Sequence, residues 1–237
     1  MSFFMGFIDR QLISEPAVPT SSFNGQTIIV TGANSGLGLE ASRMLIKLGA
    51  LRVILACRNL DKGKTAAKDI QTITGCSNET LDVWSLDMSN YASVLSFADR
   101  AKSELPRLDA MILNAGLYVH KYRLQEGNEE IINTNVISTA LLAFLLHPKL
   151  QQTATQYHIS THLTITGSEL YEVAKFKEAK VPNRQIFETL NDEEVFKKNK
   201  YDRYNVSKLL VMFVLKELSA MAPVEKTGVV VDVVAPG

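Results

Sequence analysis

The sequence predicts one α/β domain built on a doubly wound parallel sheet. Short runs rich in Val, Ile and Leu alternate with longer segments whose apolar residues recur at helical spacing, an order typical of a parallel sheet with crossover helices. The chain has 237 residues and a hydrophobic content of 46%, which is enough for one sizeable core. No internal repeat or low-complexity tract divides it. We expect an N-terminal extension over residues 1–24 and a single domain over residues 25–237.

The expected elements follow from the period of the apolar residues. Runs of β-branched residues bounded by turn residues predict strands, and apolar positions three and four apart predict helices. The predicted strands are 27–31, 52–56, 81–86, 109–113, 162–166 and 229–234, and the predicted helices are 37–49, 61–73, 90–104, 126–147 and 203–221.

Residues 169–202 interrupt this alternation with a stretch that is dense in Lys and Glu. The stretch is too long for an ordinary connection between a strand and a helix, so we expect an insertion that forms a lid or a pocket wall. A solvated surface insertion fits the composition equally well. Within it, "LNDEEVFKKN" predicts a short helix with Asn191 as its N-cap, acids in its first turn and lysines in its last.

The charge balance argues against nucleic acid or an anionic membrane as a partner. Lys and Arg together number 25, and so do Asp and Glu, so no overall basic field is present. A small-molecule ligand is the expected partner. The two cysteines, Cys57 and Cys76, follow no repeated spacing, and we expect reduced thiols in a cytoplasmic protein.

The opening "MSFFMGFIDRQLI" is apolar, but Asp9 and Arg10 interrupt it too early for a membrane span or a signal peptide. Phe4, Ile8 and Leu12 share one face of a helix at this spacing. We expect that face to pack against the domain, with a membrane surface as the alternative. The sequence therefore predicts no transmembrane segment here.

A glycine-rich turn joins the first predicted strand to the first predicted helix, in "TIIVTGANSGLGLEAS". Glycines there let a ligand approach the backbone, and the amides and dipole at the helix start favour a phosphate. The spacing G-x-x-x-G-x-G departs from the usual dinucleotide fingerprint G-x-G-x-x-G, and a tight turn without a ligand is the alternative. We assign cofactor binding in this turn to Gly32, Asn34, Ser35, Gly36, Leu37 and Gly38.

Two further residues follow the second and third predicted strands. "ILACRN" has Arg58 where an enzyme selective for NAD needs a carboxylate, and a guanidinium suits the 2′-phosphate of NADP. "SLDMSN" has Asp87 at the carboxyl edge of the sheet, either facing the adenine or capping the helix that starts near Tyr91. We expect NADP as the cofactor, with Arg58 and Asp87 in its site.

Three motifs taken together resemble the short-chain dehydrogenase/reductase family from Thr27 to Gly237: the glycine turn, "ILNAG" at 112–116 and "YNVSK" at 204–208. The resemblance implies a Rossmann-type domain and hydride transfer between a nicotinamide and a carbonyl or alcohol. "ACRN" and the long spacer before "YNVSK" are most similar to the retinol-dehydrogenase-like branch and to fungal reductases. The residues matching the family's fourth-strand motif, which borders the cofactor, are Asn114, Ala115 and Gly116.

Tyr204 is the expected proton donor. Carbonyl reduction needs a proton for the oxygen on which negative charge develops, and a phenol supplies it readily only if its pKa falls from about 10. Lys208 lies four residues further along the predicted helix, on the same face, so its ammonium is expected to lower that pKa. Tyr201 competes, but its equivalent neighbour, Asn205, carries no charge. The family resemblance also implies that Tyr204 and Lys208 border the cofactor, with the lysine holding the nicotinamide ribose.

Two more catalytic residues follow from the resemblance. Ser168, in "LTITGSELY", matches the serine that holds the substrate oxygen, with Thr166 as a weaker candidate and a simple turn serine as the alternative. The interval from Ser168 to Tyr204 is longer than is common in the family. Asn135 matches the fourth catalytic residue, whose backbone positions a water in the proton relay, and Asn133 is expected to be a neighbouring polar position.

A metal site is not expected. His158 and His162 are four residues apart, but that spacing forms a zinc pair only on a helix, and "HISTHLTIT" predicts an extended segment without a third ligand.

The sequence predicts an NADP(H)-dependent oxidoreductase that interconverts a ketone or aldehyde and an alcohol, on a small apolar or secondary-metabolite substrate. The alternative is a truncated, catalytically weak NADP(H)-binding protein that acts as a regulator or partner subunit. The resemblance also implies a homodimer through helices 126–147 and 203–221. Family members continue beyond the turn that closes "GVVVDVVAPG", so we expect a truncated form that lacks part of the substrate wall and leaves the sixth strand as an exposed edge.

Overall fold

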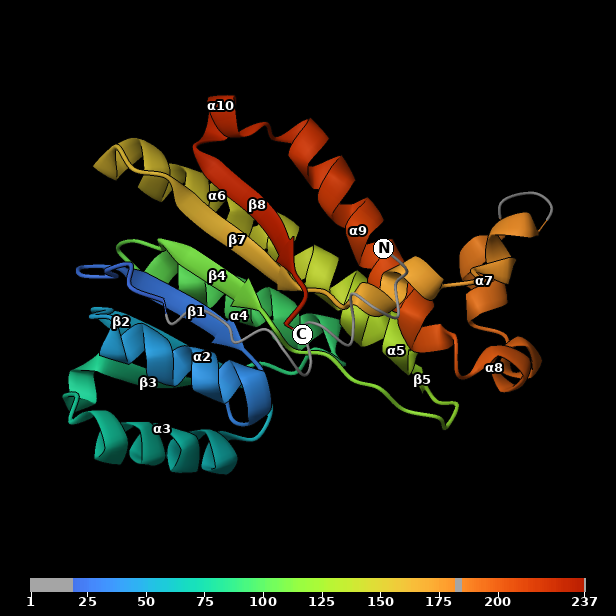
Figure 1. Cartoon of the computed structure of the whole chain (residues 1–237), viewed down its shortest axis with the longest axis horizontal. Helices are drawn as coiled ribbons and strands as arrows, with labels where there is room; N and C mark the ends of the chain where they lie inside the picture. The colour runs from blue at the N-terminus through green and yellow to red at the C-terminus, as the bar shows by residue number, and fades with distance from the viewer. Residues whose placement is uncertain (1–18, 182–184, 237) are drawn as a thin grey trace.

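A six-stranded parallel sheet forms the centre of the molecule (Figure 1). The computed structural model describes residues 19–181 and 185–236, so Phe4, Ile8, Leu12 and Gly237 lie outside the described residues. The strand order is β3-β2-β1-β4-β7-β8, which confirms the predicted doubly wound fold class. The strands are β1 (Thr27–Thr31), β2 (Arg52–Cys57), β3 (Leu81–Ser85), β4 (Ala110–Leu113), β7 (Thr161–Thr166) and β8 (Val229–Val234), each within one residue of its predicted range.

Helices cover both faces of the sheet, each over its own apolar core. One core lies between the strands and two of the helices, and includes Ile28, Val30 and Ile70. The other lies on the opposite face and includes Trp84, Phe97 and Leu146. The helices at residues 36–47 and 60–74 lie at the β1–β3 end of the sheet, whereas those at 139–157 and 203–221 lie beside β7 and β8 (Figure 1). The helices are α2 (Gly36–Lys47) and α3 (Leu60–Thr74) on one face, and α4 (Tyr91–Glu104), α6 (Thr139–Tyr157) and α9 (Arg203–Met221) on the other.

The start of the predicted helix 126–147 is wrong, because a β-hairpin occupies its first residues. Strands β5 (Leu124–Gln125) and β6 (Asn128–Glu129) pair in antiparallel fashion. Glu126 and Gly127 form the turn with φ of 51° and 78°, and two positive φ angles suit a tight hairpin turn. The helix therefore begins only after the hairpin, as α5 (Glu130–Ile132) and the π-helical segment η2 (Asn133–Ser138), which lead into α6.

The predicted end of the same helix is also wrong, because α6 continues through Pro148 to Tyr157. Proline removes one backbone hydrogen bond from a helix interior. Leu146 and Leu150 on either side are fully buried in the core, and this burial holds the helix together across the defect. His158, with a φ of 55°, ends it. Among the described residues one helix, Glu130–Tyr157, is long and apolar enough to cross a membrane, and 67% of its apolar window is buried within the fold.

The described residues of the insertion, 169–181 and 185–202, form four short helical segments at one end of the sheet. Figure 1 shows α7 and α8 beyond the strands of the main sheet, and α7 contacts β6. Leu190 and Phe196 are fully buried, so the insertion is packed against the domain, although its role as a lid stays a prediction. The segments are η3 (Glu169–Val173), η4 (Lys177–Lys180), α7 (Ile186–Leu190) and α8 (Glu193–Asn199).

The expected cap of the helix in the insertion is corrected by one residue. The side chain of Asp192 accepts a hydrogen bond from the Val195 amide at 2.8 Å and caps α8. Asn191 instead accepts from the Glu129 amide at 2.9 Å and so joins the insertion to the hairpin. An acid one residue later is an equally good cap, and the tertiary bond takes the asparagine away from that role.

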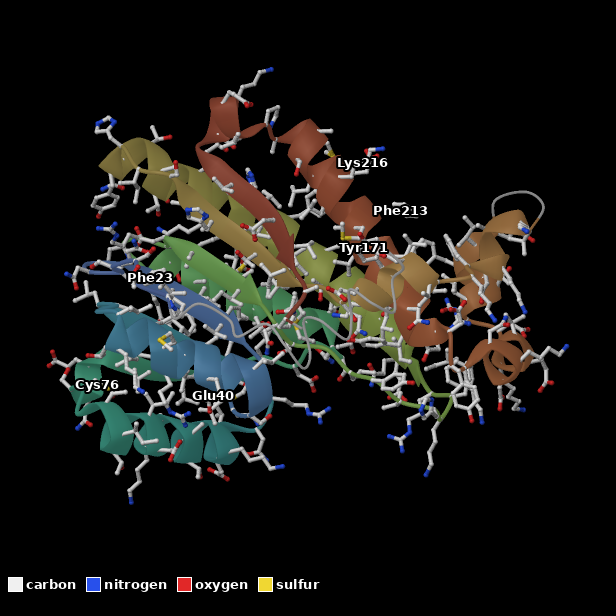
Figure 2. All side chains as sticks on the ribbon, viewed as in Figure 1. Phe23, Glu40, Cys76, Tyr171, Phe213 and Lys216 are labelled. Carbon is white, nitrogen blue, oxygen red and sulfur yellow. The ribbon has the colours of Figure 1, made fainter. Side chains whose placement is uncertain are left out.

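The helices predicted to form the homodimer interface carry exposed apolar side chains. Phe213 and Lys216 lie along the side of α9 that faces away from the sheet (Figure 2), with the Phe213 side chain about half exposed. Phe144 on α6 is exposed to a similar degree. In the sheet formed by the described residues, β8 is one of the two edge strands and β3 is the other. The dimer stays a prediction.

Candidate active site

The glycine turn after β1 packs closely on the end of β4. Gly32 and Gly36 have φ of 66° and 55°, a backbone region that favours glycine. A Cβ at Gly38 would lie 2.6 Å from both the Gly32 carbonyl oxygen and the Asn114 Nδ2. The same Nδ2 donates to the Thr31 carbonyl at 3.0 Å. The turn therefore depends on glycine where the helix meets the two strand ends.

The start of α2 has the character of an anion site. Ser35 occupies the N-cap position with extended backbone and makes no side-chain capping bond, and the first turn contains no acidic residue. Amides at such a start have no partner from the helix itself, and the helix dipole favours negative charge beside them. The glycine spacing G-x-x-x-G-x-G therefore still places a helix start with free amides at this turn, although it differs from the usual fingerprint.

A pocket of about 360 Å³ opens beside the glycine turn, at the carboxyl ends of β1 to β4. The chain reverses its order between β1 and β4, and ligands of open α/β sheets bind at such a switch point. Of the residues predicted to bind the cofactor, the pocket is lined by Gly32, Asn34, Ser35, Arg58, Asp87, Asn114, Ala115 and Gly116.

The other predicted cofactor residues lie around the pocket. Leu37 is 55% exposed and Gly38 is buried beneath the turn. Gly36, Tyr204 and Lys208 also lie outside the pocket lining. Half of the residues that line the pocket were not predicted from the sequence. Those next to the predicted strand ends could have been found from their position at the carboxyl edge of the sheet, whereas those from the hairpin and η2 belong to no recognisable motif. The missed lining residues are Ala56, Cys57, Leu86, Met88, Ser89, Leu117, Gln125 and Thr134.

Asp87 lines the pocket and does not cap α4. Its carboxylate accepts hydrogen bonds from the Ser89 amide at 2.9 Å and the Ser89 hydroxyl at 2.7 Å. The cap of α4 is Asn90, whose side chain accepts from the Ser93 amide at 2.8 Å. The capping alternative for Asp87 is therefore wrong. Arg58 is exposed at the rim, directly after β2.

Tyr204, Lys208 and Ser168 meet at the carboxyl end of β7. The Lys208 ammonium donates to the Thr166 carbonyl at 2.6 Å and lies 5.5 Å from the centre of the Tyr204 ring. Ser168 follows β7, and its hydroxyl accepts from the Leu170 amide at 3.3 Å. Ser168 also interacts with the Tyr204 phenol. By contrast, Tyr201 is 69% exposed.

The electrostatics of this cluster correct one expectation. Burial raises the pKa of Tyr204, the hydrogen bond to Ser168 acts in the opposite direction, and the charge interaction with Tyr118 also raises the pKa. The expected lowering of this pKa by Lys208 is therefore wrong for the described residues. Burial lowers the pKa of Lys208 itself to about 8. The reason is the same for both groups, because a buried site disfavours the charged form.

Asn135 lies in the π-helical segment η2 and is 3% exposed. Its Oδ1 accepts from the Leu117 amide at 2.9 Å, and its Nδ2 donates to the Leu117 carbonyl at 3.0 Å and to the Ser207 hydroxyl at 3.1 Å. The side chain thus joins the loop after β4 to α9. Local π-helical geometry is frequent at functional sites. Asn133 is fully buried two residues earlier.

The histidine pair does not share a helical turn. His158 caps the end of α6 in the left-handed conformation, and His162 lies on β7. Within residues 19–181 and 185–236, no group of three or more His, Cys, Asp or Glu side chains is placed to hold a metal ion. Cys57 and Cys76 are free thiols.

Comparison with known sequences decides the family. Residues 26–159 match the family model for short chain dehydrogenases. A short chain dehydrogenase/reductase of Cryptosporiopsis sp. is 42% identical over 233 residues, which cover 98% of this chain and 72% of the relative. The chain belongs to the short-chain dehydrogenase/reductase family. A short-chain dehydrogenase of Penicillium roqueforti is 37% identical and matches 98% of this chain. This chain spans only 60% of that family member.

Solved structures of the same family have the same fold. A short chain dehydrogenase of Shigella flexneri complexed with NADP matches with a TM-score of 0.66 at 23% identity, over 92% of this chain and 80% of that one. A structure from Pseudomonas syringae matches with a TM-score of 0.69 at 20% identity, over 94% of this chain and 80% of that one. The chain is thus an oxidoreductase of the short-chain dehydrogenase/reductase family with a Rossmann-type fold.

Proposed function

We propose that this chain is an NADP(H)-dependent oxidoreductase that interconverts a ketone or aldehyde and an alcohol. The observation that carries the proposal is the meeting of Ser168, Tyr204 and Lys208 at the end of β7. This cluster lies on the same edge of the sheet as the pocket at the switch point between β1 and β4. A proton donor and a nucleotide pocket on one edge are what carbonyl reduction with a nicotinamide requires.

The residues around the pocket fit a phosphorylated dinucleotide. The start of α2 has amides without side-chain caps and no acidic residue in the first turn. The absence of a side chain at Gly38 lets this helix start pack directly on the Gly32 carbonyl and the Asn114 side chain. Arg58 at the rim favours a 2′-phosphate. The complex of the Shigella flexneri relative with NADP supports the same choice. When bound, the cofactor supplies or accepts the hydride.

The protein side of the reaction is a proton transfer. In the reducing direction, Ser168 donates a hydrogen bond to the substrate oxygen and Tyr204 gives that oxygen its proton as negative charge develops there. The resulting phenolate lies beside Lys208, whose side-chain nitrogen is 5.5 Å from the ring centre. Asn135 holds the loop after β4 against α9 and so fixes the position of Leu117, which lines the pocket. In the oxidising direction the same proton moves back to Tyr204.

Replacement of the proton donor tests this mechanism. We expect Tyr204→Phe to lower kcat for NADPH-dependent reduction of a panel of aldehydes and ketones by roughly 10²-fold to 10⁴-fold, because general acid catalysis is lost. The measurement is NADPH consumption by absorbance, repeated with NADH to establish the cofactor preference. Tyr157→Phe is the matched control, since Tyr157 lies at the far end of α6 beside Arg107. Equal turnover by Tyr204→Phe and the unaltered protein would rule out the mechanism.

A second candidate function is NADP(H) binding without catalysis, as a regulator or partner subunit. The raised pKa of Tyr204 favours it, because a phenol stabilised in its neutral form is a weaker proton donor. A fluorescence titration with NADPH alongside the turnover assay separates the two functions. Saturable binding with no turnover of any carbonyl compound supports the second function, and turnover excludes it.

We also propose a small apolar or secondary-metabolite substrate and a cytoplasmic location. The fungal sources of the Cryptosporiopsis and Penicillium roqueforti relatives support the first, and the two free thiols support a reducing compartment.

A further inference from the structure

Four aromatic side chains form a continuous row that begins at the proposed proton donor. The ring of Tyr204 lies 4.9 Å from that of Tyr118, which lies 4.8 Å from the imidazole of His120. His120 in turn lies 5.2 Å from the ring of Tyr201. We call Tyr204, Tyr118, His120 and Tyr201 the aromatic row. Tyr118 and His120 come from the loop between β4 and β5, Tyr201 from the turn before α9, and Tyr204 from the first turn of α9. The fold therefore brings them together from distant parts of the chain.

The row runs from a half-buried position to solvent. Tyr204 is half-buried, whereas Tyr118 is 56% exposed and Tyr201 is 69% exposed. His120 is exposed as well. Large aromatic side chains usually bury most of their surface in a core. These rings are instead exposed to solvent and contact one another in a row that starts at the reacting phenol. They are therefore available to contact a ligand.

Packing alone does not account for the row. The neighbouring rings are tilted by 55° to 76°, so each presents a different edge or face, and such arrangements are favourable for aromatic partners. Tyr118 and Tyr201 are absent from the apolar cores of the described residues. The core beneath the insertion consists mainly of aliphatic residues such as Ile132, Leu190 and Val206. The aromatic row therefore forms part of the surface beside the site and is not part of the apolar core.

We propose that the aromatic row is a substrate subsite that selects planar aromatic carbonyl compounds over saturated ones of the same size. The inference rests on the proposed function, because it takes Tyr204 as the group that contacts the substrate oxygen. A ketone or aldehyde conjugated to a ring places that ring within a few ångströms of its oxygen, and thus next to Tyr118. A larger fused ring system extends along the row towards His120 and Tyr201. A saturated ring is puckered and has no π-face to stack.

The test compares matched ketones in the NADPH-dependent assay. The pairs are 1-tetralone with 1-decalone, and acetophenone with cyclohexyl methyl ketone. The quantity measured is the ratio of kcat/KM for the aromatic member to that for the saturated member. Since one aromatic contact contributes a factor of about 2 to 10, we expect Tyr118→Leu to lower this ratio by that factor. Tyr118→Phe keeps the ring, and we expect it to keep the ratio.

A second variant and a binding measurement make the outcome independent of folding and of turnover. If Tyr118→Leu does not fold, as judged by thermal unfolding, Tyr201→Leu alters the exposed end of the row. Calorimetric titration with 1-naphthol and with decahydro-1-naphthol measures the subsite without a reaction. Tighter binding of 1-naphthol that is weakened in either leucine variant supports the subsite, even if no ketone is reduced and the proposed function fails. Turnover with an unchanged ratio in the leucine variants, or equal binding of the two alcohols, would overturn it.

Discussion

The two halves of the site are held together by different forces. Around the glycine turn, backbone geometry and neutral hydrogen bonds position the groups, as in the bond from Asn114 to the Thr31 carbonyl. Around the hairpin, the insertion and the start of α9, buried charges meet instead. Arg203 is 1% exposed, and Glu129 and Glu178 are 0% and 3% exposed. We call the region around the glycine turn the proposed nucleotide half, and the region around the hairpin, the insertion and the start of α9 the proposed substrate half. The nucleotide half therefore depends on shape, and the substrate half depends on charge.

The charged cluster joins three separate segments next to the proposed proton donor. Arg203 precedes Tyr204 on α9, and its Nε lies 3.8 Å from the Glu129 Oε2 on the hairpin. Its Nη2 lies 3.5 Å from the Glu178 Oε1 in η4. Glu129 also accepts from the Ile131 amide at 3.1 Å. Burial lowers the pKa of Arg203 and raises that of Glu129. Each charge is thus costly alone, and Arg203 on one side and the two carboxylates on the other stabilise each other.

The largest expected effect breaks this cluster. We expect Arg203→Met to lower the free energy of unfolding by about 3 to 5 kcal/mol, because two buried carboxylates lose their cation. Urea unfolding measures the change. The matched control is Lys197→Met in the neighbouring insertion, where an exposed ammonium pairs with Glu193 and Glu194 and its loss costs less than about 1 kcal/mol.

A compensating variant sharpens the same test. The triple variant Arg203→Met, Glu129→Gln, Glu178→Gln removes all three charges, and we expect it to recover a large part of the stability lost in Arg203→Met. If Arg203→Met alone costs no more than the Lys197→Met control, charge does not hold the substrate half together and the contrast between the two halves fails.

The next effect is a dependence of stability on pH at Lys208. Its pKa is lowered to about 8 in the folded protein, from an ordinary value of 10.5. Below about pH 8 the folded state carries the full cost of a buried ammonium, and above about 10.5 neither state is protonated. Between these values the unfolded chain binds more protons, so the free energy of unfolding rises with pH, by about 3 kcal/mol over the whole window.

The variant Lys208→Met removes this titration. We expect the stability of the unaltered protein, relative to that of the variant, to increase from pH 7.5 to pH 10.5. Both are measured by urea unfolding in a Tyr204→Phe background, so that the neighbouring phenol does not titrate. A constant difference across the window would mean that Lys208 keeps an ordinary pKa, and that the substrate half is less strongly desolvated than its burial indicates.

The sequence allowed the nucleotide half to be predicted more completely than the substrate half. The strands lie within one residue of their predicted ranges because β-branched runs and turn residues act locally. The glycine turn and Asn114 also carry local motifs. Arg203 and Glu178 look like surface charges in the sequence, and only the fold reveals that they are buried together. The predicted direction of the shift in the Tyr204 pKa was wrong for the same reason, because the burial of this side chain depends on segments far away in the chain.

The smallest expected effect tests the role of shape in the nucleotide half. An alanine in a helix interior normally stabilises relative to glycine by roughly 0.5 to 1 kcal/mol. At Gly38 the sign should reverse, because the added Cβ would meet the Gly32 carbonyl oxygen and the Asn114 side chain at 2.6 Å. We expect Gly38→Ala to cost about 1 to 3 kcal/mol, measured by urea unfolding, and to weaken NADPH binding in a fluorescence titration.

Gly75→Ala separates steric contact from backbone strain. Gly75 has a φ of 69° at the end of α3, and a Cβ there meets no atom within 4 Å. Its replacement should cost about 1 kcal/mol through strain alone and leave NADPH binding unchanged, since α3 ends away from the pocket lining. If Gly38→Ala is as stable as the unaltered protein and binds NADPH equally well, the turn has room that its packing does not indicate. Shape would then not be the force that distinguishes the nucleotide half from the charged half.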